Sequence, residues 1–325
     1  MTSTDTTRRH TPITVAPLEE VDLPEADAVF RLAFGTMLGL PDPARFAEGT
    51  QMIRSRWLAD PSGAFKAVVE GEIVGSAFTT RWGSYAGFGP LTVRPDFWDK
   101  GVGSRLWEAR LPLLELWGIT DASLFTSSES TKHVHLYQKF GFWPRFLTAL
   151  TDKMLTSSLS LDASDPAETL SSLAAAMQDQ ALRECGALAD AIYPGLDLTR
   201  EIRAVTDRRI GDVVLLREAG SIAGFAVCHA GTGSETGPGT CYIKFAAARP
   251  GAAAHRFGLL LDRCENYARS RDLARLEVGI NLACHDAYRL LTARGHRTYR
   301  QGVAMHWRNQ PGFSRPDSFV LHDGR

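Results

Sequence analysis

Two glycines and one tyrosine are the residues of this chain best placed to do chemistry. Gly101 and Gly103 follow an apolar stretch that ends at Val93, and the residues after them have a helical pattern. A strand that runs through a glycine loop into a helix directs several backbone N–H groups at one point, which suits a phosphate group. Tyr137, in a short predicted helix further on, has a phenol that stays protonated at neutral pH. The pattern therefore predicts an anion site accompanied by a proton donor.

Other phosphate-binding motifs fit this loop poorly. A dinucleotide fingerprint requires a third glycine three residues after the second one, and Leu106 stands at that position. The sequence also contains no Gly-x-x-x-x-Gly-Lys-Ser/Thr segment. Both kinds of nucleotide-binding fold are therefore disfavoured.

The loop and the tyrosine together resemble the GNAT superfamily of acyl-CoA-dependent N-acyltransferases. The family's first signature is a strand ending in Val-x-Pro and followed by a Gly-x-Gly loop, which this chain matches with Val93, Pro95, Gly101 and Gly103. The second signature is a short helix with Tyr four residues before Gly and then an aromatic residue, matched by Tyr137, Gly141 and Phe142. The spacing between the two signatures also fits the family.

Three positions depart from the family pattern. Trp98 stands where Gln or Arg is usual, Asp99 where Gly is common, and Ser130 where Asn is frequent. A carboxylate beside a pyrophosphate is unfavourable, so we expect the Asp99 side chain either to turn away or to pair with Lys100.

The resemblance implies an acetyl-CoA site and a role for each matching residue. The backbone of Leu91 and Val93 would bind the pantetheine arm in a gap between two parallel strands. The pyrophosphate would lie against the amides of the loop and helix start, with a cation nearby, and the residues implied are Lys100, Gly101, Val102, Gly103, Ser104 and Ser130. Tyr137 would be the general acid that protonates the leaving thiolate; the alternative is a core aromatic residue.

The base and the acceptor pocket are less well defined by the sequence. Glu129, His133 and His135 are candidates for a base, and none is assigned because the amine could arrive neutral or lose its proton to water. The aromatic residues before and within the cofactor strand would line an acceptor pocket, or would be core residues instead: Trp82, Tyr85 and Phe88.

The composition narrows the possible partners. With a net charge of −1 and a pI near 6.8, the chain is expected to bind neither nucleic acid nor an anionic membrane. No secretory signal and no membrane-length apolar run is present, so we expect a cytoplasmic protein, monomeric or weakly dimeric. The five cysteines are irregularly spaced without a Cys-x-x-Cys pair, and they predict small buried side chains rather than disulfides or a metal site.

The order of predicted elements occurs twice, which indicates an internal duplication within an α/β fold that has a mixed sheet. We expect a flexible N-terminus (1–11), a GNAT domain with the acetyl-CoA site (12–154), a connector (155–166), a degenerate GNAT-like domain (167–309) and a tail (310–325). The second domain is called degenerate because aligning Pro250 with Pro95 puts Arg256 where Gly101 stands, and aligning Gly295 with Gly141 puts Leu291 where Tyr137 stands.

Several element boundaries are also predicted. Helices are expected over 44–58 and 167–192, a hairpin over 64–80, and a kink or break at Pro112, which lacks the N–H that a helix interior needs. The function predicted from the whole pattern is transfer of an acetyl group from acetyl-CoA to a primary amine of a small molecule. The alternatives are a mycothiol-synthase-like acetyltransferase and a noncatalytic acyl-CoA-binding sensor module.

Overall fold

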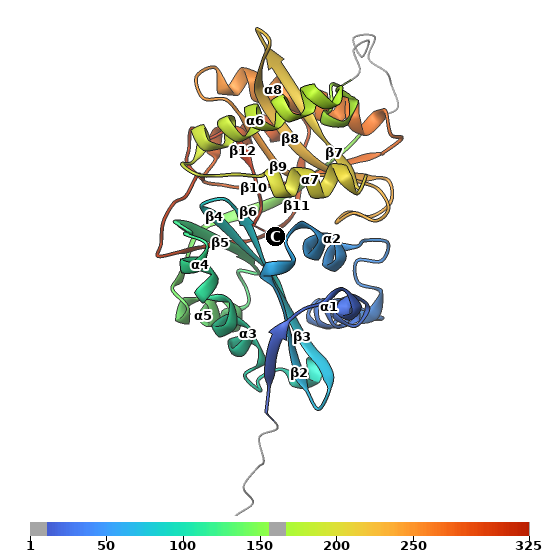
Figure 1. The fold of residues 1–325 in the computed structure, drawn as a ribbon, viewed down its shortest axis with the longest axis vertical. Helices are drawn as coiled ribbons and strands as arrows, with labels where there is room; N and C mark the ends of the chain where they lie inside the picture. Colours follow the sequence, from blue (N-terminus) through green and yellow to red (C-terminus); the bar gives the residue numbers. More distant parts are fainter. Residues whose placement is uncertain (1–11, 156–166, 325) are drawn as a thin grey trace, which may run out of the picture.

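The computed structural model describes residues 12–155 and 167–324. Within these ranges twelve strands form one mixed sheet that runs through both halves of the molecule (Figure 1). The strands are β1 (Thr14–Pro17), β2 (Ala64–Val69), β3 (Glu72–Trp82), β4 (Tyr85–Val93), β5 (Asp121–Thr126), β6 (Phe142–Met154), β7 (Gly211–Glu218), β8 (Ser221–Ala230), β9 (Thr240–Ala248), β10 (Arg275–Asn281), β11 (Arg297–Trp307) and β12 (Val320–Leu321). The α-helices are α1 (Leu23–Met37), α2 (Met52–Ala59), α3 (Val102–Arg110), α4 (Pro112–Leu116), α5 (Thr131–Lys139), α6 (Ala175–Ile192), α7 (Thr199–Asp207), α8 (Ala253–Arg269) and α9 (His285–Ala293).

Local sequence signals account for most of these boundaries. The hairpin of β2 and β3 forms as predicted, and Pro112 separates α3 from α4. Two predicted helices are too long. In the range 44–58, only α2 is an α-helix, because the chain before it turns through Gly49 at a φ of 84°. In the range 167–192, α6 starts late because Thr169 forms a β-bridge with Val214 instead.

The two halves exchange their last strands at the centre of the sheet. The strand order is β1-β2-β3-β4-β5-β11-β6-β10-β9-β8-β7, so β11 of the second half lies between β5 and β6 of the first. In return, β6 pairs antiparallel with β10 of the second half over Thr148–Met154. Neither half therefore completes its sheet alone. The prediction of two consecutive domains did not include this exchange of strands. The predicted connector lies almost entirely outside the described residues.

Helices cover both faces of the sheet. In Figure 1, α1 and α2 lie on one side of the first half's strands, and α3, α4 and α5 lie on the other. In the second half, β7 is apolar without alternation because both of its faces are buried. Val213 and Leu215 pack with α6 and α7, whereas Val214 and Leu216 pack with α8.

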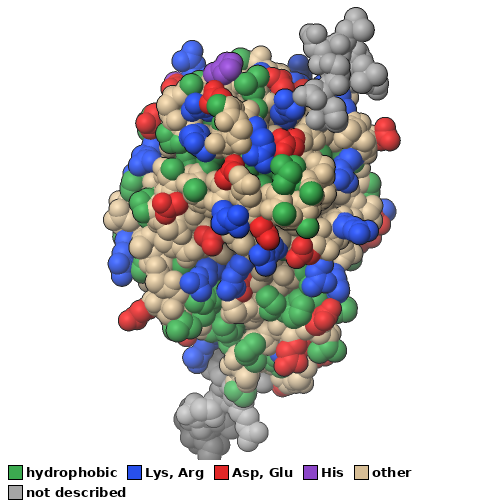
Figure 2. Space-filling view, turned by 45° about the horizontal axis from the view of Figure 1, so that its top comes forward, with side chains coloured by type: hydrophobic (Ala, Val, Ile, Leu, Met, Phe, Trp, Pro, Cys, Tyr) green, Lys and Arg blue, Asp and Glu red, His purple; other side chains and the backbone are tan. Residues whose placement is uncertain are grey.

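The helices, the surface charges and the cysteines bear on where the protein could act and on how it is stabilised. No helix in the described ranges is both long enough and apolar enough to cross a bilayer. Figure 2 shows positive and negative side chains interspersed on the face it displays, as expected for a net charge of −1. All five cysteines are free and buried, which confirms the prediction that they are small buried side chains.

Candidate active site

The site is built around a gap between two parallel strands of the first half. β4 and β5 pair only from Tyr85 opposite Asp121 to Phe88 opposite Leu124. Beyond that point β4 continues beside β3 alone, as far as Val93. The later backbone of β4 therefore borders a gap on the side of β5, which is where the family resemblance implies the pantetheine arm.

A β-bulge explains why the strands part there. Ala77 pairs with Leu91 and Thr79 pairs with Phe88, so two residues of β4, Gly89 and Pro90, lie opposite one residue of β3. A bulge bends the strand that carries the extra residue, and Pro90 has no N–H to give to the ladder.

The glycine loop forms a cradle beside this gap. Gly101 is the N-cap of α3 with a φ of 83°, a conformation that glycine adopts without strain, and apart from its chain neighbours no atom lies within 4 Å of where its Cβ would be. The amide of Arg105 donates to the Gly101 carbonyl at 3.1 Å, which starts the helix. The earlier amides, those of Val102, Gly103 and Ser104, have no acceptor within the helix. They form the donor set that a phosphate group needs.

Gly103 brings the predicted motifs into contact. A Cβ at Gly103 would lie 3.9 Å from the side chain of Leu91 on β4 and 3.7 Å from that of Leu136 on α5. The cofactor strand, the cradle and the tyrosine helix therefore meet at this residue.

Charged residues around the cradle pair differently from the expectation. The Asp99 carboxylate lies 2.5 Å from the Lys132 ammonium of α5, whereas the Lys100 ammonium lies over the ring of Phe97. The indole Nε1 of Trp98 donates to the Val93 carbonyl at 2.7 Å, so that carbonyl is already occupied. Sequence reasoning missed Lys132 because its contact with the loop spans a long stretch of chain.

Tyr137 is buried beneath the gap. Its ring packs edge-on against Trp107 at 5.5 Å between centroids. Burial raises the pKa of the phenol, while the Arg110 cation and a hydrogen bond with Thr126 lower it. Thr126 is the last residue of β5, past the point where the two strands separate, so the phenol group reaches the gap side of the core.

Two further candidates lie at the start of α5. The Ser130 hydroxyl is 2.9 Å from Nδ1 of His133, so it orients this imidazole. The pKa of His133 is lowered by burial and by the nearby Lys132 ammonium, which keeps the ring neutral at neutral pH. His133 also stacks near Tyr137, with 6.3 Å between ring centroids.

The three aromatic residues considered for an acceptor pocket are core residues instead. Phe88 stacks on Trp107 at 4.7 Å, and its side chain is buried. Trp82 and Tyr85 pack in the core of the second half, where Tyr85 also bonds to Ser123. This corrects the pocket interpretation, because all three side chains are buried among packing partners. The core alternative was the one that their residue type favoured.

The corresponding gap in the second half is filled by the chain itself. β9 and β10 pair in parallel only as far as Ile243 opposite Val278. Beyond that point β12 pairs with β9 at Ala246 and Ala247, and His322 bridges to Ile280. The C-terminal segment therefore lies where the first half has its gap.

The second cradle is also closed. The Arg256 guanidinium donates to the carbonyls of Arg249 and Pro250 and pairs with Glu218. Leu291, which stands at the tyrosine position, is fully buried. The features predicted to be lost from the second half thus correspond to a filled groove and a blocked helix start.

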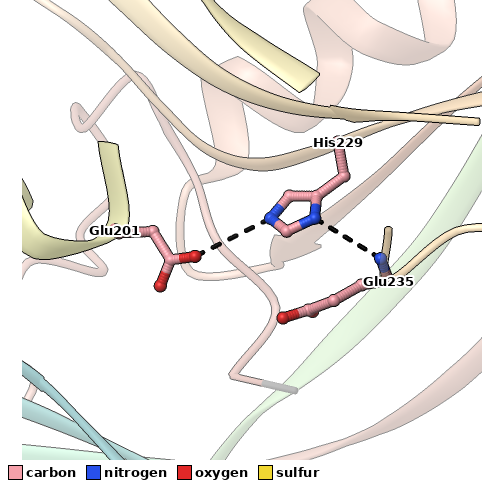
Figure 3. Close-up of side chains that lie close together, drawn as sticks. All are labelled: Glu201, His229 and Glu235. Atoms are coloured by element: carbon pink, nitrogen blue, oxygen red, sulfur yellow. Dashed lines mark hydrogen bonds and ion pairs between the residues drawn. The ribbon is translucent and has the colours of Figure 1, made fainter. Parts of the chain in front are cut away.

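A buried group of Glu201, His229 and Glu235 has the composition of a metal site (Figure 3). The Lys244 ammonium lies 2.9 Å from Glu201 and 2.5 Å from Glu235, so it already occupies the cation position between them. Burial would raise the pKa of Glu201, but Lys244 and His229 lower it overall. Arg56 on α2 pairs with Glu235 at 2.7 Å, so the group links the two halves.

Comparisons with known proteins agree with this fold. Residues 31–142 match the acetyltransferase (GNAT) family profile. The whole chain is similar to a proposed acetyltransferase from Pyrococcus horikoshii, with a TM-score of 0.68, 13% identity, and coverage of 96% of this chain and 95% of that one. It is also similar to a GCN5-related N-acetyltransferase from Sphaerobacter thermophilus, with a TM-score of 0.58, 14% identity, and coverage of 94% and 96%.

A third similar structure is a tandem GNAT protein from the clavulanic acid biosynthesis pathway, with a TM-score of 0.56, 14% identity, and coverage of 91% of this chain and 98% of that one. No curated protein matches the chain in sequence. At these identities the similarity establishes the fold. The chain is thus a tandem GNAT-fold protein whose first half carries the acetyltransferase family pattern, which confirms the predicted resemblance and mixed-sheet fold class.

Proposed function

We propose that this protein transfers an acetyl group from acetyl-CoA to a primary amine of a small molecule. The observation that carries this proposal is the gap between β4 and β5, which has the glycine-capped start of α3 beside it and Tyr137 beneath it. The GNAT fold supports acyl transfer in general. That the donor is acetyl-CoA and the acceptor is a primary amine is what this proposal adds.

The residues of the cradle suit a phosphorylated carrier. Its unpaired amides lie at a helix N-terminus, where each negative charge gains roughly 0.3 to 1 kcal/mol from the helix dipole. The open space at Gly101 leaves room for an anion to approach the backbone. Acetyl-CoA, when bound, would supply an activated thioester to the gap.

The remaining groups would carry the proton transfers. Tyr137 would donate its proton to the sulfur as the carbon–sulfur bond breaks, since the phenol is protonated at neutral pH. His133 is a base candidate, because its imidazole is neutral and can accept a proton from the attacking amine. Leu91 would hold the carrier arm through its backbone at the edge of the gap.

Thiol release from acetyl-CoA in the presence of a panel of amines tests this function. The panel should include polyamines, aminosugars and a cysteinyl amine, the last to probe the mycothiol-synthase-like alternative. The Tyr137→Phe variant should bind acetyl-CoA normally in calorimetry but release thiol at least a hundredfold more slowly, within the range typical of general acid catalysis. Tyr299→Phe, which changes a half-exposed tyrosine, is the matched control and should behave as the wild type.

The outcomes separate the candidate functions. Binding of acetyl-CoA without thiol release for any amine would favour the noncatalytic sensor. Unaltered turnover in Tyr137→Phe would leave Tyr137 as a core residue only. Absence of acetyl-CoA binding would overturn the assignment of the site itself.

A further inference from the structure

Arg110 is a charged residue at a position where the helix pattern calls for an apolar one. It ends α3 and lies one turn after Leu106, on the face of the helix that packs into the core. Its side chain has no solvent exposure. A buried guanidinium is unfavourable by several kcal/mol unless other groups compensate its charge, so its presence needs an explanation.

Part of the explanation is structural. Arg110 donates from Nε to the Leu106 carbonyl at 3.1 Å and from Nη1 to the Phe78 carbonyl at 3.0 Å. Phe78 lies opposite the bulge of β4, where the ladder between β3 and β4 is interrupted. The guanidinium also lies over the rings of Trp107 and Phe88, at 4.5 and 5.2 Å from their centroids. These contacts hold the bulge that opens the gap.

These contacts give Arg110 no negatively charged partner. No carboxylate in the described ranges acts on Arg110, and its Nη2 atom has no hydrogen-bond partner there. Burial lowers the pKa of the guanidinium to about 9, and among described groups Tyr137 alone offsets this effect. The Trp107 ring places the two residues together, since the Arg110 guanidinium lies 4.5 Å from its centroid and the Tyr137 ring packs edge-on against it at 5.5 Å.

The charged and titratable groups around Tyr137 are few. Arg110 of α3 contacts the same Trp107 ring as Tyr137, and His133 faces the phenol from one turn earlier in α5. The core cluster around Tyr137 is otherwise apolar, and Thr126 adds only a neutral hydroxyl. Because His133 is neutral at neutral pH, Arg110 is the cation that acts on the phenol there.

We propose that Arg110 is a positioning residue for the transfer reaction: its buried cation stabilises the negative charge that forms on the Tyr137 oxygen as the phenol gives up its proton. This inference rests on the proposed function. In that step the amine nitrogen bonds to the acyl carbon, the carbon–sulfur bond breaks, and the proton of Tyr137 passes to the sulfur. Tyr137 is left as a phenolate, and a proton lost by the amine restores it through solvent.

The energetic need for such a cation follows from the burial of Tyr137. A phenol in an apolar core resists ionisation, because its charged form loses hydration. A phenol that resists ionisation is a poor proton donor to a thiolate, because the corresponding thiol has a pKa of only about 8.5. A fixed cation in the same core lowers the free-energy cost of ionising the phenol, and no solvent has to reorganise.

A double-mutant cycle tests whether Arg110 acts through Tyr137. Arg110→Met should lower thiol release roughly tenfold or more in the wild-type background, and less than twofold in the Tyr137→Phe background. Arg110→Lys keeps a positive charge and should retain most of the activity. Arg81→Met, which removes another arginine stacked on an aromatic ring of the same half, should leave activity unchanged. Equal losses from Arg110→Met in both backgrounds would overturn the proposal and leave Arg110 with a packing role only.

A second readout does not depend on catalysis. The chain has seven tyrosines, and incorporation of 3-fluorotyrosine would give each a fluorine NMR signal, with that of Tyr137 identified by its loss in Tyr137→Phe. The pKa of this phenol should rise in Arg110→Met and stay near the wild-type value in Arg110→Lys. If this pKa rises in Arg110→Met but the wild-type protein transfers acetyl to no amine, the coupling is upheld and the proposed function is rejected. An unchanged pKa in folded Arg110→Met would reject the coupling.

Discussion

The Asp99 carboxylate and the Lys132 ammonium meet at 2.5 Å, joining the glycine loop before α3 to the first turn of α5. Both side chains are mostly exposed, so the pair adds little to stability. Its position is more consequential than its strength, because it lies beside the amides that would hold a pyrophosphate. A bound phosphate would attract Lys132 and repel Asp99.

This geometry predicts opposite effects of two substitutions on acetyl-CoA affinity. Asp99→Asn should tighten binding severalfold in low salt, since it removes a repulsive charge and frees Lys132. Lys132→Met should weaken binding by a similar factor, whereas Lys139→Met, at the other end of α5, should have no effect. Both changes should fade at about 1 M salt, where charges are screened beyond about 3 Å. Calorimetry at two ionic strengths measures this, and equal affinity of all the variants in low salt would contradict it.

Gly101 should be essential to the cradle in a way that Gly258 is not. Gly101→Ala places a side chain at a φ of 83°, which is strained by about 1 kcal/mol or more and would shift the loop amides. We expect acetyl-CoA affinity to fall roughly tenfold. Gly258, inside α8 at the position of the second half that aligns with Gly103, tolerates alanine because helix interiors favour it. A loss of affinity in Gly258→Ala would show that the second half takes part in binding.

The buried charges that join the halves should dominate stability at their interface. Glu235→Gln would leave Arg56 and Lys244 partly uncompensated inside the protein, and we expect a loss of about 3 to 5 kcal/mol in unfolding free energy. Glu48→Gln, which breaks an exposed pair with Arg45, should change it by less than about 0.5 kcal/mol. Urea unfolding of the three proteins gives the comparison. Similar stability of both variants would mean that the network is not rigidly buried.

The sequence was sufficient for the local features of the site and insufficient for the long-range ones. The hairpin, the cradle loop and the break at Pro112 depend on glycine, proline and alternation, whose effects are local. The apolar pattern of β6 and β11 shows that they are strands, but not that each pairs with the other half. One signal was present and not used: a charge on the apolar stripe of α3, at Arg110.

The C-terminal segment escaped prediction for a related reason. A pair of apolar residues, Val320 and Leu321, is too short to indicate a strand in a tail. Its place is fixed by an existing gap between β9 and β10, which offers unpaired backbone on both sides. The strands that form the groove, β9 and β10, are far from this segment in the sequence, so only the folded chain shows that they pair with it.

Docking of this segment should make stability depend on pH through His322. Burial lowers the pKa of His322 to about 4, although Asp323 partly opposes this, so the folded protein holds the ring neutral. The unfolded chain binds a proton near the ordinary value of 6.5, and stability should therefore be full above that pH and fall as the pH drops from about 6.5 to 4. Each pKa unit corresponds to about 1.4 kcal/mol, which gives a loss of roughly 3 kcal/mol from this residue.

Unfolding free energies measured between pH 7.5 and 4 would check this expectation. His322→Gln should be less stable than the wild type at pH 7.5 and should show a shallower decline toward low pH. His296, whose pKa burial also lowers to about 4, should account for part of the slope that remains. His255→Gln changes an exposed histidine of α8 and should reproduce the wild-type curve. An identical slope in wild type and His322→Gln would mean that the C-terminal segment leaves its groove before His322 is protonated.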